Sequence, residues 1–496
     1  MDKTTNRKMV SAAIMVSILL VAIDTTIVTT AMPHIVKQLS GLKLISWVFA
    51  IYLLTTAITT PIYGKLADML GRKPVFLFGI VLFVIGSMLS GAAQSMLQLI
   101  CFRAFQGIGA GAVIPLSITI FGDIYTGEER GRMQGLVSSV WALAGLLGPL
   151  AGGLFVDYLS WRWIFYINMP VGIAATILIM SYLHEPQPEH AKKDIDYWGA
   201  ATFTIAMGSL LFALISGGES YAWNSAPIIS LLAVAFVFSG IFLAVESKAK
   251  NPMLPLSIFK IRVIAISNLV GFVASSVLIG VNVYLPIWIQ ILQGQSATSS
   301  GLVLMPMSLA WPLASTLAGR YMYRIGSKFT VLLGTALIAA GSAWLLLVNT
   351  ASPYWFFVGI IIIMGLGMGA SSTPLIVLIQ SAVGWNFRGV ATASNSLTRT
   401  LGQTVGIAVL GAAFNNSLNS YVLNHLPSGW QGGDISNALM SASANIPPGV
   451  LEQLRSGMAH SLHLVFILVF ALALITVLAS VTLPSHQEIM AKQQAD

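Results

Sequence analysis

The sequence predicts an all-α integral membrane protein with fourteen membrane-spanning helices. Only 8% of its 496 residues are charged, whereas 56% are hydrophobic. A helix of about twenty apolar residues crosses a hydrocarbon core of ~30 Å, and fourteen such stretches follow one another along the chain. They cover residues 9–32, 44–63, 75–93, 96–121, 133–156, 163–183, 197–216, 227–245, 263–291, 299–318, 329–348, 354–380, 390–414 and 462–483.

The distribution of basic residues supports both this number of spans and an orientation. When the links between stretches are assigned alternately to two sides, most of the 25 Lys and Arg residues fall on the side of the N-terminus. The other side holds only Lys37, Lys43, Arg162 and Arg455. By the positive-inside rule, both termini face the cytoplasm. The net charge of +8 therefore reflects topology and attraction to anionic lipid rather than nucleic-acid binding.

The composition also excludes several function classes. The single cysteine, Cys101, lies inside an apolar stretch, so disulfide bonds play no part. The sequence has no phosphate-binding G-x-x-x-x-G-K loop, no H-E-x-x-H motif and no Cys/His cluster. We therefore expect no cofactor, no metal and no enzymatic activity, and any transport must be driven by a gradient. The first apolar stretch is full-length and no cleavage site follows it, which argues against a signal peptide.

The chain repeats itself at an offset of about 258 residues. Chance in a glycine-rich chain is the alternative explanation, but the matches also fall in equivalent stretches and links. They include Gly107 with Gly365, Gly109 with Gly367, Gly111 with Gly369, Gly131 with Gly389 and, at a slightly shorter offset, Gly64 with Gly319. This spacing fits two six-helix bundles in parallel, pseudo-twofold repeat with two inserted helices between them, an arrangement found in secondary transporters.

Domain boundaries follow from this repeat. We predict a first bundle over residues 1–184 and a second over 261–496. Residues 185–260 would form a cytoplasmic linker and the two inserted helices. The stretch 415–457 is rich in Asn, Ser and Gly and is predicted to be a long extracellular loop. It would either cover the exit as a short hairpin or be a tolerated surface loop, because long loops cost little entropy.

Five motifs occur in order along the first half. They read Ile23-Asp24-Thr25-Thr26, Gly64-Lys-Leu-Ala-Asp68-Met-Leu-Gly71-Arg72-Lys73, Leu99-x-x-x-Arg103-x-x-Gln106-Gly107, Gly145-x-x-Gly148-Pro149-x-x-Gly152-Gly153 and Trp161-Arg162-Trp163-Ile-Phe165-x-x-Asn168. Together they resemble the major facilitator superfamily. The fourteen spans and the Gly148-Pro149 run resemble its fourteen-helix drug:proton antiporter branch. The resemblance covers the whole chain and implies the major facilitator fold and export.

Asp24 is the only acid well inside an apolar stretch. With a rise of ~1.5 Å per residue, it lies about 12 Å from the outer end of its helix, and Arg103 lies at about the same depth. Burial disfavours a charged carboxylate, and intramembrane acids are costly and functional as a rule, so Asp24 is predicted to carry the coupling proton. Arg103 stays charged and would hold Asp24 in one conformation and release it in another. A permanent structural pair is the alternative.

The remaining candidate residues form three groups. The predicted cytoplasmic gate consists of Gly64, Asp68, Gly71, Arg72 and Arg388, and the helix that begins at Arg388 is expected to contact Asp68. The resemblance implies that Gly145, Gly148, Pro149, Gly152 and Gly153 form an antiporter motif, in which small residues and a bend allow close helix packing. Candidates for the substrate cavity are Gln106, Trp141, Asn282, Trp311 and Arg399. Packing, interfacial anchoring or a structural hydrogen bond are the alternatives for this last group.

The sequence thus predicts a proton-coupled antiporter that exports hydrophobic or amphipathic drugs across the cytoplasmic membrane. It would rock its two halves around a central cavity, and the proton would enter from outside at Asp24. We expect a monomer whose partners are small substrates, protons and membrane lipids, without nucleic acid. Export of lipids or lipid precursors by the same fold, and a non-transporting sensor, are the alternatives.

Overall fold

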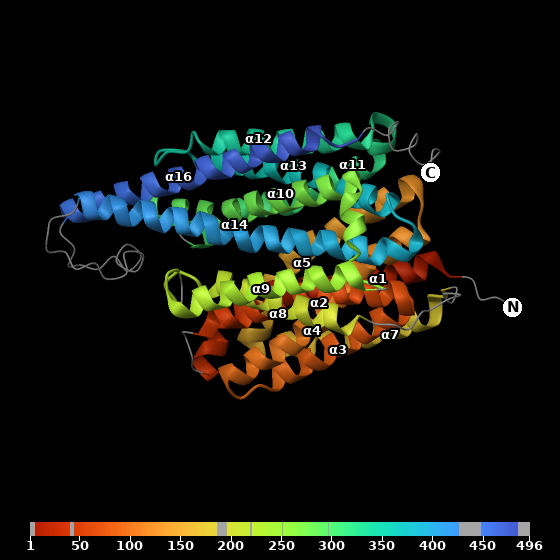
Figure 1. Ribbon diagram of the computed structural model, residues 1–496. Helices are drawn as coiled ribbons and strands as arrows, with labels where there is room; N and C mark the ends of the chain where they lie inside the picture. Colours follow the sequence, from red (N-terminus) through yellow and green to blue (C-terminus); the bar gives the residue numbers. More distant parts are fainter. Residues whose placement is uncertain are drawn as a thin grey trace.

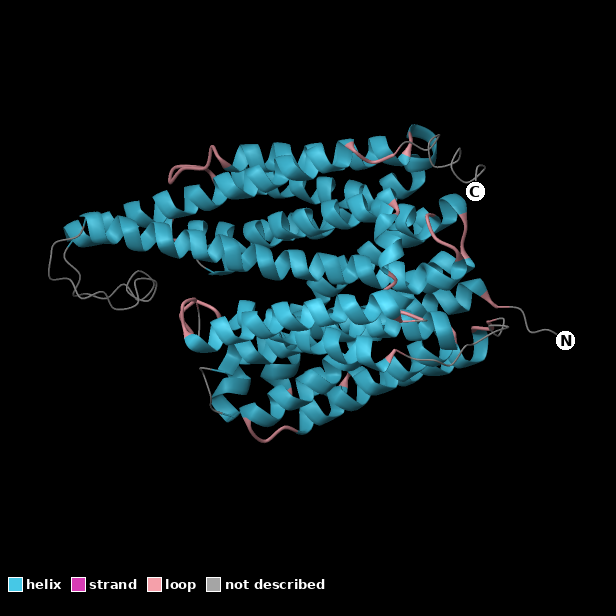
Figure 2. Ribbon diagram, in the orientation of Figure 1, coloured by secondary structure: helices cyan, strands magenta, loops and turns pink. Residues whose placement is uncertain are grey.

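The computed structural model describes residues 5–39, 44–185, 196–218, 221–249, 251–295, 297–425 and 448–484. These residues are almost entirely helical (Figures 1 and 2). The helices are α1 (Arg7–Leu39), α2 (Ile45–Leu70), α3 (Arg72–Ala92), α4 (Met96–Ile124), α5 (Gly127–Tyr158), α6 (Trp163–Tyr166), α7 (Asn168–Tyr182), α8 (Tyr197–Ser216), α9 (Ala226–Lys248), α10 (Arg262–Ile287), α11 (Ala297–Ile325), α12 (Ser327–Leu345), α13 (Tyr354–Ser381), α14 (Arg388–His425) and α16 (Pro448–Val481).

The predicted number of long helices is present. Within the described ranges, thirteen helical segments are long and apolar enough to cross a membrane, and α6 and α7 together make one of them. The fourteenth long helix is α14, which has 38 residues and is richer in Asn, Ser and Thr than the others. It packs against α2, α10 and α16 and occupies the place of the thirteenth predicted stretch.

The helices α14 and α16 differ from the sequence prediction, because they extend into the predicted loop 415–457. α14 continues to His425 and α16 begins at Pro448, while residues 426–447 lie outside the described residues. The extension has a physical cause: Leu418 and Met458 are buried in the same apolar cluster. Figure 1 shows these two helices projecting together beyond the rest of the bundle.

The sequence repeat has a structural counterpart in two groups of helices, α1–α7 and α10–α16 (Figure 1). In the first group, a Cβ placed on Gly109 of α4 would lie 2.7 Å from the carbonyl oxygen of Gly79 in α3. In the second group, a Cβ on Gly367 of α13 would lie 2.7 Å from the carbonyl oxygen of Gly334 in α12. The glycines recur because each half needs the same close helix contact.

The helices α8 and α9 lie along the boundary between the two groups (Figure 1). Leu211 of α8 packs in an apolar cluster with Leu54 and Ile58 of α2. Phe203 of α8 shares another apolar cluster with Val390 of α14. The helix pair therefore contacts both halves rather than belonging to either one.

The two halves meet most closely at one end of the bundle. α1 begins and α16 ends there (Figure 1), and we call it the basic end after its arginines, which are Arg7, Arg72, Arg130, Arg324 and Arg388. A Cβ on Gly131 of α5 would lie 2.8 Å from the Cα of Gly319 in α11, and a Cβ on Gly64 of α2 would lie 2.9 Å from the carbonyl oxygen of Gly389 in α14. These two contacts are related by the repeat, since Gly131 corresponds to Gly389 and Gly319 to Gly64.

Candidate functional site

The centre of the first half contains a buried charge pair. The Asp24 side chain of α1 is 0% exposed, and its Oδ2 accepts a hydrogen bond from Nη1 of Arg103 at 2.5 Å. Its Oδ1 accepts a hydrogen bond from Nε2 of Gln106 at 2.8 Å. Arg103 and Gln106 lie three residues apart on α4, so one face of that helix supplies both donors. The structure thus brings together the two residues that the sequence places at equal depth.

Three further side chains complete the surroundings of this pair. Asn168 of α7 donates to Oδ1 of Asp24 at 3.3 Å and to the Ser87 hydroxyl at 2.9 Å. The Tyr52 ring lies 4.1 Å from the Arg103 guanidinium carbon, a cation–π contact. None of these three residues is among the candidates that the sequence predicts. Asn168 offered a usable signal, because it is an amide at the start of an otherwise apolar stretch and belongs to a quoted motif.

The charge state of Asp24 determines whether the buried Arg103 has a counter-charge. Asp24 and Arg103 are both almost fully buried and neutralise each other. If Asp24 bound a proton, Arg103 would lose its counter-charge, and removing one partner of a buried pair costs about 3–5 kcal/mol. Nε of Arg103 already lacks a hydrogen-bond partner among the described residues. Protonation would therefore favour any rearrangement that gives Arg103 new partners.

A second buried cluster joins the two halves at the basic end. Asp68 of α2 accepts hydrogen bonds from the backbone N–H groups of Gly389 at 3.0 Å and Val390 at 2.9 Å. Both groups belong to the first turn of α14, where the helix dipole favours an anion. Asp68 also pairs with Nη2 of Arg72 at 2.7 Å. This is the contact between Asp68 and the start of the helix at Arg388 that the sequence predicts.

Asp123 at the end of α4 extends this cluster and was not among the predicted residues. One oxygen pairs with Nε of Arg72 at 3.0 Å, and the other pairs with Nη1 of Arg388 at 2.9 Å. Arg72 also donates to the carbonyl oxygen of Trp385 at 2.7 Å and stacks on its ring at 4.0 Å. Asp123 therefore bridges arginines from both halves. Its role could not be found by looking for acids deep inside apolar stretches, because it lies at a helix end.

Glu185 holds the start of α3 from the other side. Its two oxygens accept hydrogen bonds from the backbone N–H groups of Arg72 at 3.1 Å and Lys73 at 3.0 Å. Burial raises the pKa of the Glu185 carboxyl, and the hydrogen bond from Lys73 opposes that shift. Gly71 precedes α3 with φ +95, and a Cβ there would lie 3.0 Å from Glu185. Gly71 is thus required both by its backbone conformation and by this close approach.

The glycines of the predicted antiporter motif have different surroundings. A Cβ on Gly148 of α5 would lie 2.9 Å from Cβ of Thr26 in α1, and the Thr26 hydroxyl donates to the carbonyl oxygen of Ala144 at 3.1 Å. A Cβ on Gly145 would be 3.7 Å from the Ser308 hydroxyl, an ordinary contact, and one on Gly153 would meet nothing within 4 Å. Gly152 is buried and Pro149 lies within α5. Close approach thus explains Gly148 but not Gly153.

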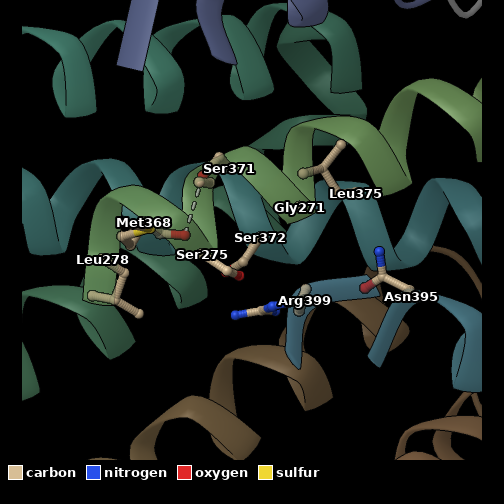
Figure 3. A pocket seen from close by; sticks show the side chains of 10 residues that line it. Gly271, Ser275, Leu278, Met368, Ser371, Ser372, Leu375, Asn395 and Arg399 are labelled. Atoms are coloured by element: carbon tan, nitrogen blue, oxygen red, sulfur yellow. Dashed lines mark hydrogen bonds between the residues drawn. The ribbon is translucent and has the colours of Figure 1, made fainter. Parts of the chain in front are cut away.

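The five candidates for the substrate cavity do not gather in one place. Gln106 is fully buried and bonded to Asp24, so the structure assigns it to the charge pair instead of a cavity wall. Arg399 lines a small cavity between α10, α13 and α14 (Figure 3). Trp141, Asn282 and Trp311 are partly exposed on α5, α10 and α11 and do not line that cavity.

We expect Asp68→Asn to weaken the contact between the halves at the basic end. The amide keeps the volume but removes the charge that binds Arg72 and the first turn of α14, and hydrogen bonds to a charged group contribute about 1.5–3 kcal/mol each. Closure should become at least tenfold less favourable. The measurement is the distance between spin labels at Glu129 and Arg324, both exposed, in a Cys101→Ser background. Glu452→Gln, at an exposed site, is the control, and an unchanged distance distribution in Asp68→Asn would contradict the assignment.

Two repeated helix bundles, a buried charge pair and one tightly closed end define a membrane transporter. Comparison with known proteins identifies its family: residues 14–407 match the sequence profile of the Major Facilitator Superfamily. The chain belongs to that family. It is a multi-pass membrane transporter and not an enzyme, as the sequence predicts.

Relatives and solved structures agree with this assignment. The chain is 38% identical to multidrug resistance protein 3 of Bacillus subtilis (strain 168), over 97% of this chain and 96% of the relative. It is 37% identical to the multidrug transporter protein MdtP of the same organism, over 92% of this chain and 85% of the relative. The structure of the proton:xylose symporter XylE has a TM-score of 0.63 at 14% identity and covers 96% of each chain, which shows a common fold.

Proposed function

We propose that this protein exports hydrophobic or amphipathic drugs from the cytoplasm in exchange for protons. Its halves rock about a central cavity so that each side of the membrane gains access in turn. The basic end faces the cytoplasm, in accord with the positive-inside rule, and it is closed by the contacts of Asp68 and Asp123. In this arrangement the opposite end releases the drug and takes up the proton.

The observation that carries this proposal is the buried, neutral pair of Asp24 and Arg103. An isolated charge in the membrane interior is costly, so the pair is stable while Asp24 is ionised. A proton from outside discharges Asp24, frees Arg103 to rearrange and favours return of the carrier. One charge that moves across 100 mV supplies about 2.3 kcal/mol, which supports about a fifty-fold drug gradient.

The relatives support drugs as the substrate class. Two curated relatives that align with most of this chain carry names that refer to multidrug resistance or multidrug transport.

The contact of Gly148 in α5 with α1 lies close to the charge pair, since its partner Thr26 is two residues from Asp24 on α1. A change at Asp24 can therefore be transmitted directly to the packing of α5.

The test is uptake of a fluorescent dye into everted membrane vesicles that contain the protein. Uptake should require a proton gradient in which the vesicle lumen is acidic, and it should stop when a protonophore is added. Vesicles with empty vector are the control. Uptake that ignores the protonophore would contradict proton coupling. Transport of labelled phospholipid in place of every dye tested would favour the lipid-export alternative, and transport of neither would favour a sensor.

A further inference from the structure

Arg399 is an arginine in the membrane interior that forms no ion pair within the described residues. It lies three helical turns from Arg388 at the basic end, which is about 16 Å along α14 and near the middle of a ~30 Å hydrocarbon core. No side chain in the described parts of the chain forms an ion pair or hydrogen bond with its guanidinium. Arg103, at a comparable depth in the first half, is by contrast paired with Asp24.

The helices around Arg399 cannot supply the missing negative charge. No Asp or Glu occurs in the sequence between Glu246 and Asp434, a stretch that includes all of α10 to α14. Asp24, the buried acid of the first half, already accepts hydrogen bonds from three side chains. An unpaired charge in this position is costly. An anion that comes from outside the chain would remove that cost.

The surroundings of Arg399 fit a small anionic group. The cavity beside it has a volume of about 20 Å³, where one water molecule needs about 10–15 Å³. Ser275 and Ser372 line the cavity, and neither hydroxyl has a hydrogen-bond partner among the described residues. In Figure 3 the Arg399 side chain extends from α14 toward Ser275 and Leu278. The site thus offers a guanidinium and free hydroxyl donors beside an apolar wall.

The side-chain amide of Asn395, next to Arg399, already forms a hydrogen bond within the protein and is not counted among the free donors. Asn395 lies one turn before Arg399 on α14 and donates to Oδ1 of Asn268 at 3.0 Å. Asn268 donates in turn to the Ser394 hydroxyl at 3.3 Å. This hydrogen-bonded pair fixes α14 against α10 on the side of the cavity nearer the basic end. The free donors therefore belong to Arg399 and the two serines.

We propose that Arg399 binds the carboxylate or sulfonate of an amphipathic substrate, with Ser275 as a second donor. A planar guanidinium matches a carboxylate with two parallel hydrogen bonds. The cavity itself has room only for the anionic group, and Leu278 and Met368, which also line it, are the apolar side chains next to that group. This inference rests on the proposed function and narrows its substrates to organic anions. When one monoanion leaves and one proton enters, two charges move across the membrane in each cycle. The membrane potential therefore contributes twice the free energy that it contributes for a neutral substrate.

The experiment compares two probes that differ only in charge. Dansylglycine carries a carboxylate, and dansylglycinamide is its neutral analogue. Each is titrated into purified protein in nanodiscs, and the dissociation constant is read from dansyl fluorescence. The variants are Arg399→Gln, Arg399→Lys and, as the matched control, Arg324→Gln at the exposed end of α11. Size-exclusion elution and thermal unfolding check that each variant is folded.

We expect Arg399→Gln to weaken dansylglycine binding at least tenfold and to leave dansylglycinamide binding unchanged. Arg399→Lys should fall between, because it keeps the charge but not the paired geometry, and Arg324→Gln should match the wild type. Equal losses for both probes, or no loss for either, would overturn the proposal. Binding of dihexanoylphosphatidylglycerol that is lost in Arg399→Gln, together with no measurable binding of dansylglycine to the wild type, would assign the anion to a lipid headgroup and overturn the proposal as well.

Binding at equilibrium does not require proton coupling, so this test can fail or succeed independently of the proposed function. If the charge-selective binding is present and vesicles show no proton-driven uptake, the site stands and the transport mechanism does not. If neutral dyes are exported and Arg399→Gln binds dansylglycine normally, the mechanism stands and the anion site does not.

Discussion

Replacing Asp24 by Asn is expected to abolish proton-driven export and to leave the protein folded. Asn has the same size and can still accept from Arg103, but it cannot bind and release a proton. In the variant, residue 24 therefore stays uncharged throughout the cycle, and the charge next to Arg103 no longer changes. We expect dye uptake into everted vesicles to fall at least a hundredfold, because no other carboxyl group among the described residues is buried at this depth in the first half.

A second measurement separates lost coupling from lost binding. Counterflow exchange of labelled for unlabelled dye, without a proton gradient, needs only the loaded carrier to change conformation. This exchange should persist in Asp24→Asn, and Glu452→Gln at an exposed position should behave as wild type in both assays. Proton-driven uptake at the wild-type rate by Asp24→Asn would remove Asp24 from the mechanism. Loss of counterflow as well would indicate a purely structural pair.

The charge pair shows which part of a membrane site is predictable from sequence. Depth along a helix follows from residue counting, so Asp24 and Arg103 could be placed at one level. Rotation about the helix axis does not follow from counting, and it decides that Gln106 faces Asp24 and not a cavity. Asn168 was missed for the same reason, because its contact with Asp24 depends on how α7 packs against α1.

The basic end shows a second limit. The sequence motif identifies Asp68 and Arg72, and the repeat suggests the first turn of α14 as their partner. The role of Asp123 could not be predicted from the sequence, because it depends on how the halves pack: the two arginines that pair with Asp123 belong to different halves. The extension of α14 and α16 into the predicted loop was missed because Asn and Ser indicate a turn by composition. Tertiary packing of Leu418 and Met458 overrides that local preference.

The glycine pairs at the basic end, by contrast, occupy positions that the sequence repeat relates to each other. Gly131 meets Gly319, and Gly389 meets Gly64, so each half contributes one glycine to each of the two symmetry-related contacts. Only a residue without a side chain allows two helix backbones to come this close. The recurrence of these glycines thus indicates equivalent positions in the two halves, although the sequence alone could not show that each contact runs between halves.

Replacing Gly131 by Ala is therefore expected to prevent full closure of the basic end. The added Cβ would lie 2.8 Å from the Cα of Gly319, and a backbone cannot move aside as a flexible side chain can. Overpacking of this kind costs about 1–3 kcal/mol, and only the closed state bears the cost. The balance between the two conformations should shift by about 5- to 150-fold toward the state that is open at the basic end.

Spin labels at Glu129 and Arg324 in a Cys101→Ser background report this shift as a longer distance between α5 and α11. Gly301→Ala, in the same helix as Gly319, is the matched control because a Cβ there would meet nothing within 4 Å. Gly319→Ala should reproduce the effect of Gly131→Ala, since the contact is mutual. If the Gly131→Ala and Gly301→Ala distances were the same, the glycine pair would not set the approach of the halves. Closure would then depend on the polar contacts between the halves at this end, among them those of Asp68 and Asp123.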